Sequence, residues 1–456
     1  RNIRNALYVV VPVLIMLAYS LIRKSKQLAG DAIKHENIIL AKRLLVTSSS
    51  PNIDTLEAAN ISRAAYLLNK IGEGEEDIAF YNSMYERMGT LGGKFHFPSL
   101  TDSSKGQIRV LANAGNDTFF FGSDWGKIYK ASATDNLPRL LFDFKERITS
   151  VSISPGKRYL AVAGTFNYIR IFDIIKTTGD FFDLQIKDTA GNGKMVRFAN
   201  DSTLMVSLGS TLAALNIYTH QSIARNNAAK VYMLNRKRLA GNINASENYF
   251  ETTMGKSLSM AVSKDKIALG MDSGLILITK DTVSVFTSSD VQYPTSLAFD
   301  PQLRYLFIGT RDGSVHRMKL SNTLSNSSQY QVSRITDMNF SPDGTYMASA
   351  SFDGSVAVWT VDADWNVVTP LRIFPPKEYL YFLGDINAAY SISFEKNNQY
   401  FLAGYANGGI LKWPVSTEVL SNLICAKTDS SFNAAFLSKY ILRKETVDEL
   451  ISYKCK

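Results

Sequence analysis

A repeated unit of about forty residues constrains the fold of this chain more than any other feature. Each copy contains an alternating apolar strand, a Ser-Pro or Asp-Pro turn, a second strand rich in small residues, an Asp-Gly-like turn and a third strand. The clearest copy, ITDMNFSPDGTYMASASFDGSVAVWTVD, occupies residues 335–362. Copies begin near residues 108, 148, 194, 257, 294, 335 and 388. A period of about 40 residues with three to four strands is typical of propeller blades. The sequence therefore predicts an all-β seven-bladed propeller over residues 91–416.

Two further segments belong to this prediction. A propeller has exposed sheet edges unless its ring closes, and residues 93–97 (GKFHF) precede the first copy, so we expect them to complete the last sheet. The third copy is longer than the others and predicts an outer strand near residues 229–234, together with an Asn-rich insertion. That insertion is interpreted as a surface loop or, alternatively, as a contact loop.

These motifs resemble the WD-repeat β-propeller family, most strongly at residues 335–360. Only Trp359 and Trp413 occupy the family's usual Trp position, and its Gly-His pair is missing. The resemblance therefore implies that the hydrogen-bond network built on that His is absent or replaced. Acidic residues in the predicted turns precede or lie near a Gly, and we interpret them as turn formers rather than ligands. They are Asp124, Asp272, Asp312 and Asp353.

An uncharged segment near the start of the chain predicts a transmembrane helix. Residues 5–22 (NALYVVVPVLIMLAYSLI) contain no charge and would span about 27 Å as a helix. Tyr8 and Tyr19 lie near its ends, where aromatic rings favour the membrane interface, and Pro12 is tolerable within it. A buried core helix or a secretory signal is the alternative, but basic residues flank both ends and no cleavage site follows. We assign residues 1–26 to the span and its basic flanks.

Helical patterns surround the predicted propeller. Residues 27–90 predict a connector of short helices, interrupted at SSSPNID (48–54), where Asn52 or Asp54 can cap the second helix. Residues 417–456 predict a helical tail that packs against the connector. We interpret the connector as a spacer or, alternatively, as an oligomerisation or docking surface.

Signatures of catalytic and metal sites are missing from the sequence. It contains no phosphate-binding loop, nucleophile elbow or HExxH motif. Its four histidines lie far apart, and its two cysteines, Cys425 and Cys455, exclude a cysteine-rich zinc site. The net charge of +9 is small for 456 residues, so nucleic acid is not an expected partner. We predict no catalytic, metal or cofactor site.

The turns between the second and third strands of the copies predict a protein-binding face instead. In the WD-repeat family this turn lies on the commonly used binding face, and aromatic and Arg side chains anchor protein partners. The alternative is that these are hairpin residues without a partner. The candidates are Trp125, Phe166, Arg311, Phe352 and Tyr405.

The order of span, short helices, propeller and tail also resembles the C-terminal half of bacterial STAND-type NTPases with WD repeats. That resemblance implies a nucleotide-binding module upstream of residue 1 and a propeller in the periplasm. The positive residues after the span favour a cytoplasmic propeller instead; we prefer the periplasmic topology.

Two functions follow as hypotheses. The first is a membrane-anchored scaffold or sensor whose propeller docks a protein partner in an assembly of the bacterial envelope, with the lipid bilayer contacting residues 5–22. The second is the regulatory half of a nucleotide-driven switch. An enzyme built on the propeller is a third and weaker reading.

Overall fold

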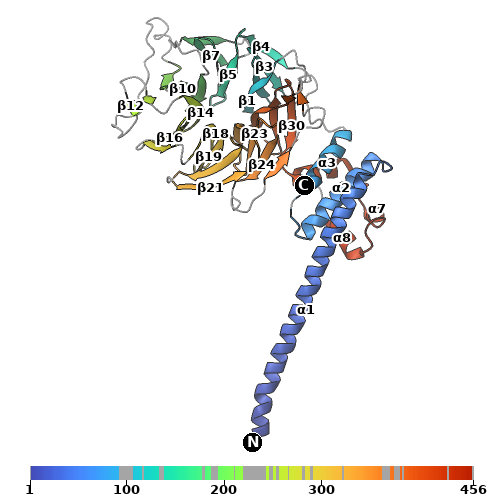
Figure 1. The fold of residues 1–456 in the computed structure, drawn as a ribbon. Helices are drawn as coiled ribbons and strands as arrows, with labels where there is room; N and C mark the ends of the chain where they lie inside the picture. Colours follow the sequence, from blue (N-terminus) through green and yellow to red (C-terminus); the bar gives the residue numbers. More distant parts are fainter. Residues whose placement is uncertain are drawn as a thin grey trace. The chain divides into compact units, whose positions relative to one another are not determined.

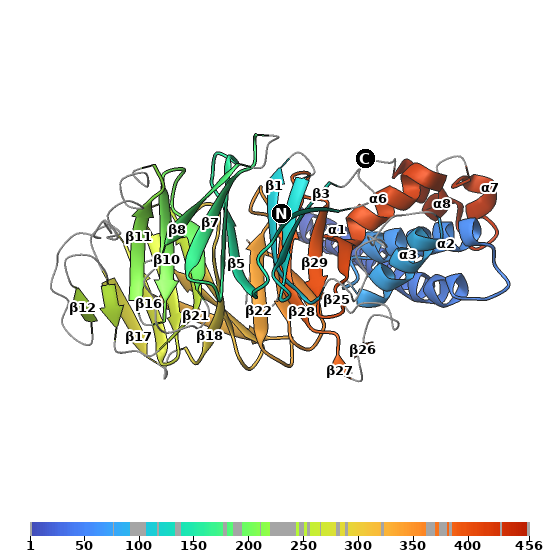
Figure 2. The same ribbon diagram turned by 90° about the horizontal axis from the view of Figure 1, so that it is seen from above.

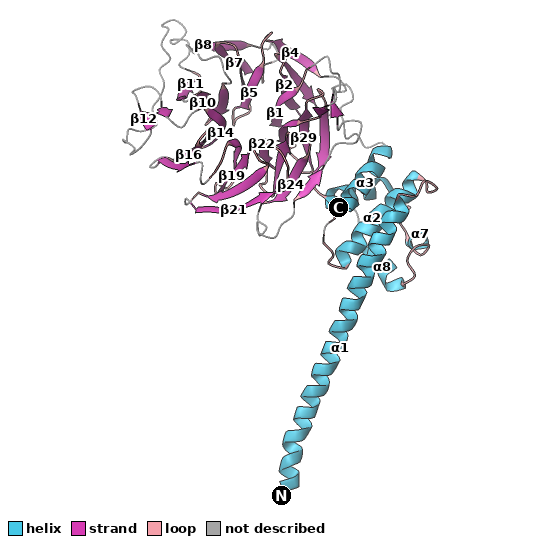
Figure 3. Cartoon of the chain, in the orientation of Figure 1, coloured by secondary structure: helices cyan, strands magenta, loops and turns pink. Residues whose placement is uncertain are grey.

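The computed structural model divides the chain into two compact units, residues 1–93 with 416–456 and residues 94–415. All described helices lie in the first unit and all described strands in the second (Figure 3). The residues that the structure describes are 2–75, 77–91, 106–115, 118–132, 138–176, 180–185, 194–209, 211–218, 243–245, 250–252, 256–264, 266–279, 283–287, 291–320, 323–361, 370–373, 381–382, 385–428 and 431–453.

The helical unit begins with one long helix. Helix α1 runs without interruption over Asn2–Ser48, followed by α2 (Thr55–Ile71) and α3 (Ile78–Thr90). Asp54 caps α2, because its Oδ1 accepts the amides of Leu56 and Glu57 at 2.9 and 3.0 Å. The tail forms α6 (Thr417–Thr428), α7 (Ala434–Leu437) and α8 (Lys444–Ser452).

The tail packs against the connector, as the sequence predicts. Helix α6 lies beside α2 and α3 (Figure 2). The Arg63 guanidinium on α2 donates to the Tyr453 carbonyl at 2.9 Å and lies 4.3 Å from the centre of the Phe432 ring. Cys425 on α6 is buried and disulfide-bonded; the only other cysteine in the sequence is Cys455. The two ends of the chain are therefore parts of one helical unit.

The predicted membrane span falls in the first half of α1. Of the residues that the structure describes, no helix combines the length and the apolar character that a bilayer span requires. Side chains of residues 2–15, which include Tyr8 and Pro12, lie outside that description, and the Tyr19 side chain is exposed. The span remains a prediction from the sequence.

Among its described residues, the second unit forms seven antiparallel sheets arranged as a β-propeller and one separate two-stranded hairpin (Figure 1). The first two sheets are β1 (Ile108–Gly115), β2 (Thr118–Ser123), β3 (Lys127–Ser132), β4 (Arg139–Asp143), and β5 (Ile148–Ile153), β6 (Tyr159–Gly164), β7 (Tyr168–Asp173), β8 (Phe181–Gln185). The third is β9 (Met195–Phe198), β10 (Thr203–Leu208), β11 (Thr211–Asn216), β13 (Phe250–Thr252), β12 (Ile243–Ala245). The fourth and fifth are β14 (Ser257–Ser263), β15 (Lys266–Met271), β16 (Gly274–Ile278), β17 (Val283–Thr287), and β18 (Pro294–Phe299), β19 (Tyr305–Thr310), β20 (Ser314–Lys319), β21 (Thr323–Gln329). The sixth and seventh are β22 (Ile335–Phe340), β23 (Tyr346–Ser351), β24 (Val356–Thr360), β25 (Leu371–Ile373), and β28 (Ala389–Phe394), β29 (Tyr400–Tyr405), β30 (Ile410–Pro414), with a separate hairpin of β26 (Tyr381–Phe382) and β27 (Asp385–Ile386).

The first strands of the sheets line the centre of the propeller, and each lies beside the first strand of the next sheet. β28 of the seventh sheet lies beside β1 of the first, so the sheets follow one another round a circle. The strand starts agree closely with the predicted copies. Residues 93–97 and 229–234 lie outside the described residues, so the predicted closing strand and outer strand are not tested; β13 and β12 occupy the outer edge of the third sheet.

Neighbouring sheets approach closely where a glycine of one faces the first residue of the next. A Cβ on Gly309 would come within 2.5 Å of Ile335 Cγ2, and one on Gly404 within 2.6 Å of Ile108 Cγ2. The second pair joins the seventh sheet to the first. The small residues seen in the second strand of each copy therefore permit the close packing of adjacent sheets.

Candidate protein-binding face

One face of the propeller carries two sets of residues, those at the starts of the first strands and those in the turns between the second and third strands. Each first strand begins at this face, and because the second strand is antiparallel it ends there, so the turns between second and third strands lie on the same face. In six of the seven sheets the first strand carries a register shift between its first and third residues. Such bulges redirect a side chain. The second residues in these strands are Arg109, Thr149, Leu258, Thr295, Thr336 and Tyr390.

Three of these second residues connect adjacent sheets. The hydroxyl groups of Thr149, Thr295 and Thr336 donate to main-chain carbonyls of the next sheet, at Lys194, Ile335 and Ala389 respectively, over 2.6–2.7 Å. These hydrogen bonds hold the starts of the inner strands together. The starts of the inner strands at the centre of the propeller are therefore held in place by hydrogen bonds and do not form a set of independent loops.

The structure separates the five predicted face residues into two groups. Trp125 and Phe352 expose 53% and 42% of their surface, and Arg311 is exposed as well. Phe166 and Tyr405 are buried, at 3% and 0% exposed, so their prediction as surface contacts is corrected.

Both buried rings fill space between strands instead of pointing outward. Phe166 is stacked on Phe144 with ring centres 4.7 Å apart and an interplanar angle of 7°. Tyr405 is enclosed completely, and that burial raises the pKa of its hydroxyl group. A turn position therefore does not by itself determine whether an aromatic side chain is available to a partner.

The acidic turn residues accept hydrogen bonds from main-chain amides, which agrees with their interpretation as turn formers. Oδ1 of Asp124 accepts the Gln107 amide at 2.8 Å, and Oδ2 of Asp272 accepts the Lys256 amide at 2.9 Å. Burial opposes ionisation of Asp312, but hydrogen bonds from Thr310 and Ser314 outweigh it and hold the pKa of Asp312 below its usual value. Asp353 accepts the amides of Ser355 and Val332 at 2.8 Å each.

A buried glutamine replaces the missing histidine network in the sixth sheet. Nε2 of Gln331 donates to the carbonyl and to the hydroxyl oxygen of Ser355, at 3.0 and 3.1 Å, and its Oε1 accepts a hydrogen bond from Ser349. Ser355 in turn donates to Asp353 at 2.6 Å. The resemblance predicted that this network is absent or replaced, and in this sheet it is replaced.

Three arginines on the face lie over aromatic rings. The Arg109 guanidinium carbon lies 3.8 Å from the centre of the Tyr390 ring, that of Arg334 5.1 Å from Phe352, and that of Arg311 5.7 Å from Tyr293. We call these six residues the arginine–aromatic face. Phe352 and Tyr390 also touch edge to face, with ring centres 6.2 Å apart, so two of the pairs are continuous.

Sequence reasoning missed four members of this face. Tyr293 and Arg334 immediately precede an inner strand, and Arg109 and Tyr390 occupy its second position. An alignment of the copies at the first residue of each inner strand would have found them, because the same two positions recur in every sheet.

Metal binding has no support among the described residues, where no group of three or more His, Cys, Asp or Glu side chains could hold an ion.

Comparisons with known proteins agree with this architecture. A family model described as "WD domain, G-beta repeat" matches residues 319–360. The WD40 β-propeller domain of Doa1 is similar in structure, with a TM-score of 0.52 at 13% identity over 69% of this chain and 95% of that one. A non-catalytic subunit of tRNA (guanine-N(7)-)-methyltransferase from Caenorhabditis elegans is 35% identical over 72 residues, or 16% of this chain. The match covers 19% of that relative's length. The second unit therefore has the fold of a WD-repeat β-propeller.

Proposed function

We propose that this protein is a scaffold whose propeller docks a protein partner on the arginine–aromatic face. The observation that carries the proposal is the continuous set of guanidinium–ring pairs formed by Arg109, Tyr390, Phe352 and Arg334 on one face. Arginine and aromatic side chains are enriched among residues that dominate binding energy. The turn acids of this face accept backbone amides, so we interpret them as turn formers rather than as contacts of a partner.

Membrane anchoring is part of the same proposal. The uncharged residues 5–22 belong to a continuous helix of 47 residues, which supports a rod that leaves the bilayer and enters the helical unit. The disulfide at Cys425 supports an oxidising compartment, and hence a propeller on the periplasmic side of a bacterial inner membrane. A cytoplasmic propeller is the alternative.

A sensor role beneath an upstream NTPase module stays a prediction from the sequence. The reading frame upstream of residue 1 tests it, since the hypothesis requires a phosphate-binding loop there.

Partner capture by the full chain in detergent tests the docking proposal. We compare the wild-type chain with Phe352→Ala and Arg334→Ala, and with the matched controls Tyr218→Ala and Lys396→Ala. Tyr218 and Lys396 are exposed residues at the opposite ends of their strands. Each face variant should reduce the amount of partner captured about tenfold or more, while the control variants should capture as much as the wild-type chain. Wild-type capture by both face variants would contradict the proposal.

A further inference from the structure

The inner strands enclose a central channel whose wider end is a cavity of 770 Å³. That volume lies within the range of about 300–1,000 Å³ found for small-molecule sites. Leu111, Val151, Leu297 and Met338 contribute apolar wall, and the opposite, narrower end of the channel is a separate cavity of 160 Å³. Arg197 and Asp337 line both cavities, so they lie where the two meet.

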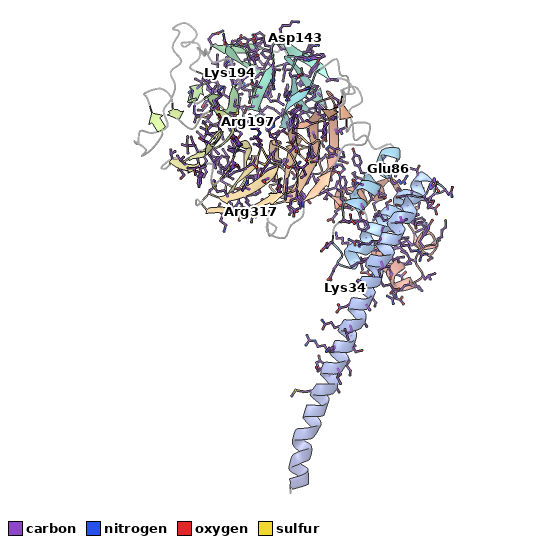
Figure 4. All side chains as sticks on the ribbon, viewed as in Figure 1. Lys34, Glu86, Asp143, Lys194, Arg197 and Arg317 are labelled. Carbon is purple, nitrogen blue, oxygen red and sulfur yellow. The ribbon has the colours of Figure 1, made fainter. Side chains whose placement is uncertain are left out.

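Arg197 on β9 points into the channel from the third sheet. Figure 4 labels it near the middle of the propeller. Its Nη1 donates to the Ser150 hydroxyl oxygen and to the carbonyls of Val151 and Val196, at 3.0, 3.3 and 2.9 Å. Among the described residues, no hydrogen bond is made by its Nε or Nη2. One edge of the guanidinium is therefore fixed, and the other is available to a ligand.

The charge of Arg197 is incompletely neutralised by the protein. Asp337 on β22 is its acidic neighbour in the channel, but the Asp337 oxygens accept the amides of Met338 and Ile392, at 2.9 Å each. Arg197 keeps some contact with water through the channel, yet the surrounding wall lowers its pKa more than Asp337 raises it. A bound anion therefore stabilises the charged form of Arg197.

Two lysines add positive charge at the wide end. Lys157 and Lys396 line the same cavity from the turns that follow β5 and β28. Nζ of Lys157 donates to the Asn113 carbonyl at 3.3 Å. These residues, with Arg197, come from the seventh, second and third sheets, while Asp337 comes from the sixth. The described lining of the wide cavity therefore contains three cationic side chains and one carboxylate, and its positive groups lie toward one side.

We infer that the wide end of the channel binds a small molecule carrying two or more negative charges, with Arg197 as the central contact and Lys157 and Lys396 at the rim. Two sources of that chemistry are a di- or tricarboxylate and a phosphate-bearing compound. The site lies at the opposite end of the channel from the arginine–aromatic face, so it does not depend on the docking proposal.

Calorimetric titration of the full chain in detergent tests this inference with citrate and with pyrophosphate as probes, at constant ionic strength set by NaCl. At least one probe should bind the wild-type chain, and Arg197→Gln should weaken that binding about tenfold or more, because a charge-assisted hydrogen bond is lost. Binding of citrate alone indicates a carboxylate ligand, and binding of pyrophosphate alone indicates a phosphate ligand.

Asp337→Asn supplies a test with the opposite sign. Removing the one carboxylate among the described residues that line the cavity should tighten probe binding about threefold, a gain that a misfolded variant cannot produce. Arg334→Ala, on the arginine–aromatic face, is the matched control and should leave probe affinity unchanged. Absence of binding by both probes, or equal affinity in the wild-type and Arg197→Gln chains, would overturn the inference and leave the docking proposal standing.

Discussion

Arg170 and Asp183 face each other on neighbouring strands β7 and β8 and are joined by two hydrogen bonds of 2.7 Å, Nε to Oδ1 and Nη2 to Oδ2. The same guanidinium lies 4.2 Å from the centre of the Phe142 ring and 3.9 Å from that of Phe181. Phe142 belongs to the first sheet and Phe181 to the second. One side chain thus joins two sheets by charge, planar hydrogen bonding and ring stacking.

Arg170→Lys should therefore destabilise the propeller by about 2 kcal/mol, since an ammonium group can neither bind a carboxylate at two points nor stack between rings. All four tryptophans of the chain lie within residues 94–415, so tryptophan fluorescence during urea unfolding reports on the propeller. Arg158→Lys is the matched control. Arg158 also binds an aspartate, Asp173, at 3.1 Å, but its side chain is half exposed, so Arg158→Lys should destabilise the propeller clearly less than Arg170→Lys. Equal effects of the two substitutions would contradict this reading.

The threonine bridges between sheets predict a small and additive effect. Thr295→Val and Thr336→Val each remove a 2.6 Å hydrogen bond to the next sheet with little change in shape. Each should lower the free energy of unfolding by about 1 kcal/mol, and the double variant by about twice that amount. Thr165→Val serves as the control, because that hydroxyl binds Glu146 at the surface over 3.2 Å and should contribute almost nothing. A double variant no less stable than either single one would be inconsistent with independent bridges.

Asp337 predicts a specific dependence of stability on pH. Burial raises its pKa to about 6, although the Ile392 amide, Arg197 and the Met338 amide oppose the rise. Because the folded-state pKa exceeds the unfolded value, the stabilising contribution of this group is fully present below about pH 4 and is lost as the pH rises through 6. The loss is of the order of 3 kcal/mol. Asp337→Asn should abolish this component, so the stability difference between the variant and the wild-type chain should change between pH 4 and 7. A difference that stays constant over this range would exclude the assignment.

The disulfide at Cys425 predicts a response to reducing agent that is confined to the helical unit. With only Cys455 available in the sequence as an intramolecular partner, the bond would close a loop that includes α7 and α8. Reduction should lower the free energy of unfolding of the helical unit by about 3 kcal/mol, measured by helical circular dichroism. The tryptophan-monitored transition should not move, and Cys425→Ser should no longer respond to reductant. Peptide mapping without reduction that finds both cysteines as free thiols would contradict the prediction.

The repeated architecture was predictable from the sequence because every copy has the same order of strand and turn signals. The inner strands begin at the expected places even in the weakest copies, where β9 and β14 have no Ser-Pro or Asp-Pro turn. The turn acids were predictable for the same reason, since the Asp-Gly geometry is local. What a side chain contacts in the next sheet was not, because that contact depends on packing between copies.

The candidate site shows this limit residue by residue. Phe166 and Phe352 occupy equivalent turns, yet one is stacked on Phe144 and the other is exposed. Arg197 was missed because a single arginine in a strand of alternating pattern usually points to solvent, whereas here it points into the channel. Arg109 was missed because the bulge that redirects the second residue of each inner strand has no marker in the sequence.

The glycine contacts between sheets predict that adding a single methyl group destabilises the propeller. Gly404→Ala would place a methyl group about 2.6 Å from Ile108 Cγ2, and overpacking of this kind typically costs about 1–3 kcal/mol. Ile108→Ala removes Cγ2, so the effects of Gly404→Ala and Ile108→Ala together should be smaller than the sum of their separate effects. Gly89→Ala, in a helix with open space around the glycine, is the control and should be neutral or stabilising. Fully additive effects of Gly404→Ala and Ile108→Ala would place the strain elsewhere.

The contact between Gly404 and Ile108 has a consequence for how the whole domain tolerates change. In a linear array of repeats, an enlarged joint only displaces the units beyond it. In a propeller the angles between successive sheets must add up to one full turn. A larger angle between two neighbouring sheets therefore has to be compensated by smaller angles between the others. Insertions in the outer loops do not meet this constraint, because they change neither the contacts between neighbouring sheets nor the circle of first strands.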